Sequence, residues 1–199
     1  MPARLYSYIV ARDYGFAPNP FYGFCTLATC KPQIRKKAEV GDWIIGTGSK
    51  SKGRDGSLVY AMRITEAMSF DEYWADSRFH GKRPYMHASV KKAFGDNIYH
   101  RESDTAPWRQ LDSHHSHEDG TQNDRNVQND TQVNRMLVSD DYIYWGGSGP
   151  QLPHFRGETV CHTTQGHRCN FPSEVVEDFV DWLRSFDDSG YCGNPLEWY

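Results

Sequence analysis

Short apolar runs, interrupted by glycine, proline and polar residues, mark the first third of the chain. The runs at 4–11, 41–48 and 58–69 are rich in β-branched and aromatic residues, and the third partly alternates. This pattern predicts three strands. Pro32 suits the first turn of a helix, so we expect a short helix over 31–38.

The pattern predicts further helices downstream. Ser69 followed by Glu72 is the spacing of a capping box, which predicts a short helix from Phe70. Pro172 or Ser173 begins the clearest helix of the chain. Its apolar stripe, which we expect to face the core, is Val175, Val176, Phe179, Val180, Leu183 and Phe186.

Residues 101–135 are polar, and strand character returns over 135–150. A structureless segment of this length is unusual in a compact domain unless it is functional or disordered. We therefore expect one domain over residues 1–199 with a polar, His-rich insertion at about 101–135. The order of elements favours an α+β fold with a small, mostly antiparallel barrel or curved sheet, because an open parallel sheet would need more helical crossovers.

Composition narrows the function classes. The net charge of −4 argues against nonspecific binding of duplex nucleic acid, which usually needs a basic surplus. The 12 Tyr, 10 Phe and 6 Trp are enough to build flat-walled pockets as well as a core. The five Cys include no CxxC pair, and no apolar run approaches a membrane span, so we expect a cytoplasmic protein with reduced thiols and no membrane partner.

Two glycine turns are candidate ligand contacts. The string from Gly46 to Ser51 fits neither the phosphate-binding P-loop nor the dinucleotide fingerprint. Gly48 would still allow close approach of a ligand, to which Thr47, Ser49 and Lys50 could donate hydrogen bonds. A plain tight turn is the alternative.

The second glycine turn is Gly146, Gly147 and Ser148. Pro150 replaces the last glycine of a serine-hydrolase elbow, and no helix follows. We therefore expect a second glycine loop that faces the first.

The segment 112–120 carries the most unusual local chemistry. Its histidines His114, His115 and His117 lie among the carboxylates of Asp112, Glu118 and Asp119. They could contact a ligand, act as a general acid or base, or bind a metal; a solvated loop is the alternative. The pair Cys161 and Cys169 lacks zinc-finger spacing.

A polar cluster precedes this loop at 96–101. The amide of Asn97 could read a base edge and Tyr99 could stack on the base, with His100 beside them. A polar turn that satisfies its own hydrogen bonds is the alternative.

Several of these strings together resemble the second of the nucleotide-modification-associated domain families. The matching blocks are "LYSYIV", "APNPFYGFCTLATCKPQIRKKAEVGDWIIGTGSK", "YAMRITEAMSFDEYW", "GDNIYHR", "DSHHSHEDG" and "YWGGSGP". The resemblance covers roughly residues 5–153. It implies a role connected with nucleic-acid modification in phages and bacteria.

A more distant resemblance, in pattern, is to the PUA-like group that includes ASCH, EVE and YTH domains. It implies a small barrel whose pocket takes a modified base or nucleotide. The counterparts here would be Asn19, Phe21, Cys25, Thr26 and Thr47–Lys50. The long His-rich insertion departs from that group, and no tryptophan cage can be assigned.

The first functional hypothesis is a binding module that holds a nucleotide or modified nucleobase, free or in nucleic acid, including a nucleotide signal sequestered in phage–host conflict. We expect no cofactor and no resident metal. The predicted ligand contacts are Asn19, Phe21, Cys25, Thr26, Thr47, Gly48, Ser49, Lys50, Asn97, Tyr99, His100, His114, His115, Ser116, Gly146, Gly147 and Ser148.

The second hypothesis is an enzyme on the same ligand class, a metal- or His-assisted nuclease, phosphodiesterase or base-modifying hydrolase. Its candidate catalytic residues are His114, His115 and His117. A scaffold for a protein partner is a third, open interpretation.

Overall fold

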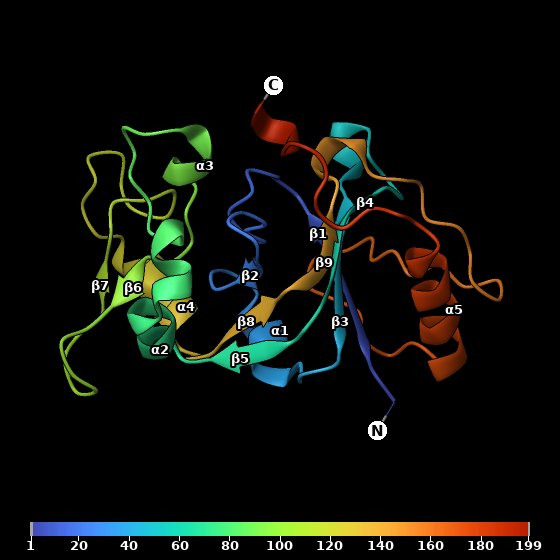
Figure 1. Cartoon of the computed structure of the whole chain (residues 1–199), viewed down its shortest axis with the longest axis horizontal. Coiled ribbons are helices and arrows are strands. Elements are labelled where there is room, and N and C mark those ends of the chain that lie inside the picture. Colours follow the sequence, from blue (N-terminus) through green and yellow to red (C-terminus); the bar gives the residue numbers. More distant parts are fainter. Residues whose placement is uncertain (1, 199) are drawn as a thin grey trace. The chain divides into compact units, whose positions relative to one another are not determined.

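The computed structural model describes residues 2–198, which form two compact units. The first unit comprises residues 2–13, 38–65 and 139–198, and the second comprises residues 14–37 and 66–138 (Figure 1). The polar segment 101–135 is part of the second unit and contains a strand and a helix.

A five-stranded sheet forms the centre of the first unit. Its strands, in spatial order, are β1 (Leu5–Val10), β3 (Trp43–Gly48), β4 (Leu58–Arg63), β9 (Asp141–Tyr144) and β10 (Gly190–Tyr191). The pairs β1–β3 and β9–β10 are parallel, and the other two pairs are antiparallel. Gly46 is needed in β3 because a Cβ there would lie 2.4 Å from the ring of Tyr60.

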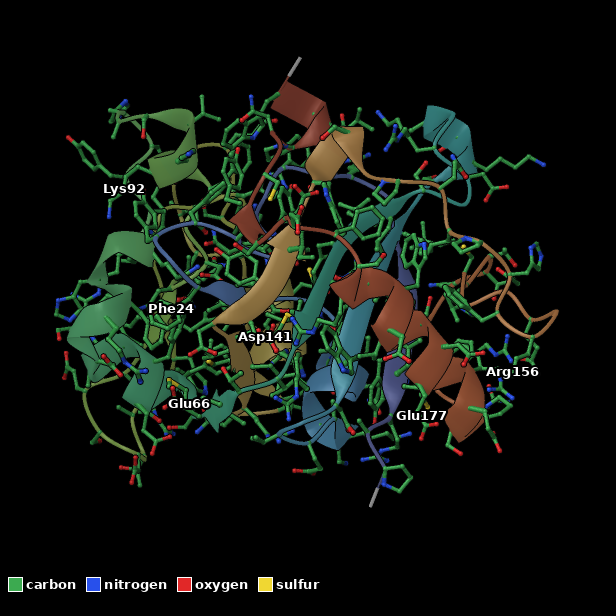
Figure 2. All side chains as sticks on the ribbon, turned by 45° about the vertical axis from the view of Figure 1, so that its right-hand side comes forward. Phe24, Glu66, Lys92, Asp141, Arg156 and Glu177 are labelled. Carbon is green, nitrogen blue, oxygen red and sulfur yellow. The ribbon has the colours of Figure 1, made fainter. Side chains whose placement is uncertain are left out.

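The helix α5 (Ser173–Arg184) packs its apolar stripe against this sheet (Figure 1). Val175, Val176, Phe179 and Leu183 are buried with residues of β1, β3, β4 and β9, as the sequence predicts. Arg184 pairs with Asp141 on β9, and Figure 2 labels Asp141 together with Glu177 of α5. The stripe therefore belongs to the core of the first unit.

The second unit combines short helices with two small sheets. One sheet has the order β2 (Cys25–Leu27), β8 (Met136–Ser139) and β5 (Glu66–Met68). The other is the antiparallel pair β6 (Tyr99–His100) and β7 (Arg109–Gln110). The helices are α1 (Pro32–Lys37), α2 (Phe70–Ala75), α3 (Val90–Ala93) and α4 (Asp124–Thr131).

Short segments of 3₁₀ helix complete the secondary structure in both units. They are η1 (Lys50–Lys52), η2 (Ser77–Lys82), η3 (Gly146–Ser148) and η4 (Leu196–Trp198).

The local predictions from sequence agree with these bounds at most elements. The capping box of α2 is complete, because the Ser69 side chain accepts from Glu72 N–H while the Glu72 carboxylate accepts from Ser69 N–H. The single strand predicted over 58–69 is wrong: it is two strands, β4 and β5, which pair with different sheets. Periodicity cannot show this break, because both pieces have strand composition.

The helices and largely antiparallel sheets fit the predicted α+β class. The strands within residues 2–198 do not close into a barrel, because β1 and β10 remain as the two edges of the larger sheet. The barrel expected from the PUA-like resemblance is therefore not confirmed. Across the same residues, every helix is too short or too polar to traverse a lipid bilayer.

Truncation of the α5 stripe should destabilise the first unit. Phe179 is fully buried, so Phe179→Ala should lower the free energy of unfolding by about 3–5 kcal/mol through lost contacts and a cavity. Urea unfolding followed by tryptophan fluorescence measures this change. The control Val40→Ala removes an aliphatic side chain that is 60% exposed and should change stability by less than about 0.5 kcal/mol. Equal effects of the two substitutions would contradict the packing of α5.

Candidate functional site: a cysteine, a histidine and an aspartate in line

The second unit brings three reactive side chains together from three separate segments. Cys30 lies in the loop between β2 and α1, His115 lies in the loop after β7, and Asp130 lies on α4. The Cys30 Sγ is 3.6 Å from Nε2 of His115, and Nδ1 of the same ring is 3.0 Å from Oδ2 of Asp130. The imidazole thus connects the thiol to the carboxylate.

Asp130 is fully buried and receives hydrogen bonds from three directions. Its Oδ1 accepts the backbone N–H of Cys30 at 2.8 Å, and its Oδ2 accepts the hydroxyl of Tyr99 at 2.8 Å as well as facing His115. A buried carboxylate is costly unless it is hydrogen-bonded in this way. Asp130 therefore fixes both the backbone of Cys30 and the ring of His115.

Arg35 secures the same region from α1. Its guanidinium is fully buried and donates to the carbonyls of Cys30 (2.9 Å), Val133 (2.9 Å) and Asp130 (2.6 Å). Burial lowers the pKa of Arg35, although Asp130 opposes that shift. Because the Arg35 side chain bonds the carbonyls of both Cys30 and Asp130, it holds the loop of Cys30 against α4.

The backbone at Cys30 has a conformation that residues other than glycine rarely adopt. Cys30 and Lys31 have φ values of 57° and 43°, in the left-handed region, just before Pro32 begins α1. Such conformations cost about 1 kcal/mol or more each and concentrate at functional sites. The strained turn presents the thiol to His115.

The electrostatics of the cluster favour a charged ring. Burial alone would lower the pKa of His115, but the hydrogen bonds to Asp130 and Cys30 and the charges of both groups raise it to about 9. His115 is therefore protonated at neutral pH. An imidazolium beside a sulfur atom stabilises the thiolate, which is the nucleophilic form of cysteine.

The same three residue types also bind metals, and their ligand atoms lie within 4.8 Å of one another; no other such group occurs within residues 2–198. The arrangement favours a proton relay, because the two ring nitrogens of His115 face different partners and one ion can take only one of them. The oxygens of Asp130 are also already occupied by N–H and O–H donors. His114, His117 and the carboxylates of Asp112, Glu118 and Asp119 form no such cluster.

His114, which was also a predicted ligand contact, packs against aromatic rings. The ring of His114 lies 4.7 Å from that of Tyr14 and 5.2 Å from those of Phe16 and Phe94. His100 packs edge-on to Trp74 at 4.2 Å, and burial first, then Arg109 and Arg83, lowers its pKa. Ser116 accepts from Ser113 N–H and donates to Asp112 within its own loop.

Three predicted ligand contacts, Asn19, Thr26 and Asn97, lie instead in a buried polar network of the second unit. The ammonium of Lys82 donates to Asn19 Oδ1 (2.6 Å) and to the carbonyls of Asn19 and Phe24 (2.9 Å each). Thr26 donates to Asp96, and the Asn97 amide donates to two backbone carbonyls. Cys25 and Phe21 are buried, and burial raises the pKa of the Cys25 thiol.

The predicted glycine turns lie in the first unit. Gly48, Ser49 and Gly146 line one cavity of about 10 Å³, which is about the space of one water. Gly147 and Ser148 line an open hollow of about 500 Å³ with Tyr191 and Asn194. Thr47 is buried and donates to the carbonyl of Tyr8, while Lys50 begins η1. The two glycine turns therefore meet at the small cavity.

A family model described as nucleotide modification associated domain 2 matches residues 2–199. The chain belongs to that family. No significant match was found among curated proteins or among solved structures. The family resemblance seen in the sequence is therefore confirmed.

Cys30 and Asp130 are site residues that the sequence did not predict. Cys30 is 85 residues from His115, and Asp130 is 15 residues beyond it. Triads have no fixed spacing in sequence, so only the fold reveals them. The one local signal was a cysteine directly ahead of a helix-starting Lys-Pro pair.

Removal of the Asp130 carboxylate should destabilise the second unit strongly. Asp130→Ala leaves the donors of Cys30, Tyr99 and His115 without their acceptor and should lower the free energy of unfolding by about 3–5 kcal/mol. Asp124→Ala on the same helix is the matched control, because Asp124 is exposed and should cost less than about 1 kcal/mol. Chemical denaturation checks both values, and a small loss for Asp130→Ala would contradict its central place.

Proposed function

We propose that this chain is an enzyme of nucleotide modification whose nucleophile is the thiolate of Cys30. The observation that carries the proposal is the line from Cys30 Sγ through the His115 ring to the buried carboxylate of Asp130. Nucleophile, base and orienting carboxylate in this order are the working parts of covalent catalysis. The substrate is a nucleotide or nucleobase, free or within nucleic acid, and the family membership supports this class.

The proposed reaction is substitution at an electrophilic sp² carbon of the base or of a group attached to it. The sulfur lone pair of Cys30 forms a bond to that carbon, and the π electrons move to its oxygen or nitrogen. When the adduct collapses, the bond to the leaving group breaks and the His115 imidazolium gives its proton to the leaving atom. A covalent thio-intermediate and a neutral imidazole result.

Water completes the cycle with the charges restored. Neutral His115 accepts a proton from water as the oxygen attacks the same carbon. Collapse breaks the carbon–sulfur bond and returns its electrons to Cys30 as thiolate. The net reaction adds one water across the bond to the leaving group, and a nucleophile other than water would give transfer in place of hydrolysis.

Asp130 acts on the ring and does not touch the substrate. Its Oδ2 faces Nδ1 of His115, which leaves Nε2 directed at the sulfur. Tyr99 and the backbone N–H of Cys30 keep the carboxylate in place. The second hypothesis from the sequence, a His-assisted hydrolase, is thus favoured over a module that only binds, with His115 as the base.

Binding without turnover is the second candidate. The hollow in the first unit favours it, because Gly147 and Ser148 line an open space with Tyr191 and Asn194. A nucleotide held there could be sequestered without chemistry. A protein of this kind would keep its ligand unchanged and would not need Cys30.

Selective alkylation of Cys30 tests the proposed nucleophile. At pH 6.5, iodoacetamide should modify Cys30 about tenfold faster than Cys192, because the ring of His115 lies 3.6 Å from the sulfur of Cys30 and assists its attack. Cys192 is more exposed, but burial of its sulfur and the nearby Asp188 raise the pKa of its thiol. Peptide mapping by mass spectrometry reads both sites in one sample. In His115→Gln the preference for Cys30 should disappear.

Turnover completes this test. Nucleotides and short oligonucleotides incubated with the enzyme should give a product by mass spectrometry that Cys30→Ser abolishes and Cys192→Ser preserves. Equal alkylation of the two cysteines in the wild type, or product formation by Cys30→Ser, would overturn the proposed function.

A further inference from the structure

The second unit exposes an apolar strip that the proposed active site does not use. Tyr22, Tyr85, Met86 and Val90 are 44%, 60%, 39% and 51% exposed, and the chain exposes few other large apolar side chains within residues 2–198. Exposed aromatic rings gathered on one surface commonly mark a binding site.

Contacts around α3 place these residues together. The Lys92 ammonium donates to the carbonyl of Gly81 at 2.8 Å and lies 6.0 Å from the ring centre of Tyr22. Tyr85 N–H donates to the carbonyl of Lys92, and the ring of Tyr85 lies 6.0 Å from that of His87. Figure 2 labels Lys92 on α3. We define the α3 strip as Tyr22, Tyr85, Met86, Val90, Lys91 and Lys92.

The charge of this segment is opposite to that of the whole chain. Residues 80–93 contain Lys82, Arg83, Lys91 and Lys92 with two histidines and no Asp or Glu, whereas the net charge of the chain is −4. Lys82 is buried, and Lys91 lies on the exposed face, 5.7 Å from the ring centre of Phe21. Cationic side chains among exposed aromatic rings can bind a chain that carries both negative charges and flat rings, because the charges pair with the cations and the flat rings stack on the aromatic side chains.

We propose that the α3 strip binds single-stranded nucleic acid, with bases stacked on Tyr85 and Tyr22 and phosphates near Lys91 and Lys92. Aromatic stacking needs unpaired bases, so a single strand fits the strip better than a duplex. A few cations suffice because stacking shares the binding energy, which agrees with an acidic protein that does not grip long duplexes.

The α3 strip lies in the same unit as Cys30, His115 and Asp130. Phe94 directly follows α3, and its ring lies 5.2 Å from that of His114, the neighbour of His115. The α3 strip and Cys30 therefore belong to one unit, and the packed rings of Phe94 and His114 lie between α3 and the loop that carries His115. Binding to the strip does not require Cys30 to be catalytic, but the idea that the bound strand carries the substrate base rests on the proposed function.

Fluorescence anisotropy with a labelled single-stranded 15-nucleotide thymidine oligomer tests the inference. Tyr85→Ala should weaken binding about tenfold, whereas Tyr85→Phe, which keeps the ring, should bind as the wild type does. Lys91→Ala should weaken binding and reduce the slope of log affinity against log salt by about 0.7. Lys36→Ala removes an exposed cation of α1 as the matched control and should have no effect.

The outcome separates this inference from the proposed function. Cys30→Ser should bind the oligomer as tightly as the wild type, and a duplex of equal length should bind more weakly. Absence of binding, or equal affinity of the wild type and Tyr85→Ala, would overturn the inference whatever the alkylation of Cys30 shows. Intact oligomer binding with unselective alkylation would overturn the proposed function alone.

Discussion

The candidate site depends on one buried carboxylate. Asp130 accepts the backbone N–H of Cys30 and the hydroxyl of Tyr99 while it faces the ring of His115, so three segments of the second unit converge on its two oxygens. A charged group without solvent contact is tolerated only where such donors surround it. The same bonds that make the burial possible therefore also align the thiol with the imidazole.

The hydrogen bonds that hold the backbone around Asp130 also position the reactive side chain of Cys30. Arg35 ties the carbonyls of Cys30 and Asp130, and the turn at Cys30 is held in a left-handed conformation that an isolated peptide would avoid. The second unit therefore contains a backbone conformation that lowers its stability and that positions the sulfur of Cys30. Rigid support of this kind is what a nucleophile needs when its base must remain within hydrogen-bond reach.

Local signals in the sequence predicted local structure well. Ser69 and Glu72 formed the expected capping box, and the stripe on α5 is buried as its spacing indicates. The long polar segment was harder to interpret, because its few apolar residues, such as Val127, are buried on a helix that polar residues otherwise dominate. The division of 58–69 between two sheets depends on partners distant in the chain, which periodicity does not encode.

The site was predicted only in part for the same reason. His115 was among the predicted ligand contacts and the alternative catalytic residues because histidines among polar residues signal chemistry. Cys30 and Asp130 were not among the predicted site residues, because neither has a neighbour in the sequence that signals chemistry. Asn19 and Thr26 have the residue types of a ligand site, yet they bond Lys82 and Asp96 inside the second unit. Residue type alone cannot separate these cases, since a buried network and a binding site use the same groups.

The central claim is that Asp130 and Cys30 together hold His115 as a charged, aligned ring. Nitrogen-15 NMR of the histidine side chains across pH measures this directly, with His115→Gln to assign the signal. The account predicts that His115 carries protons on both nitrogens at pH 7.5, titrates with a pKa of about 9, and loses this elevation in Asp130→Asn. A neutral His115 at pH 7.5, with a pKa at or below 6.5 that Asp130→Asn leaves unchanged, would contradict it.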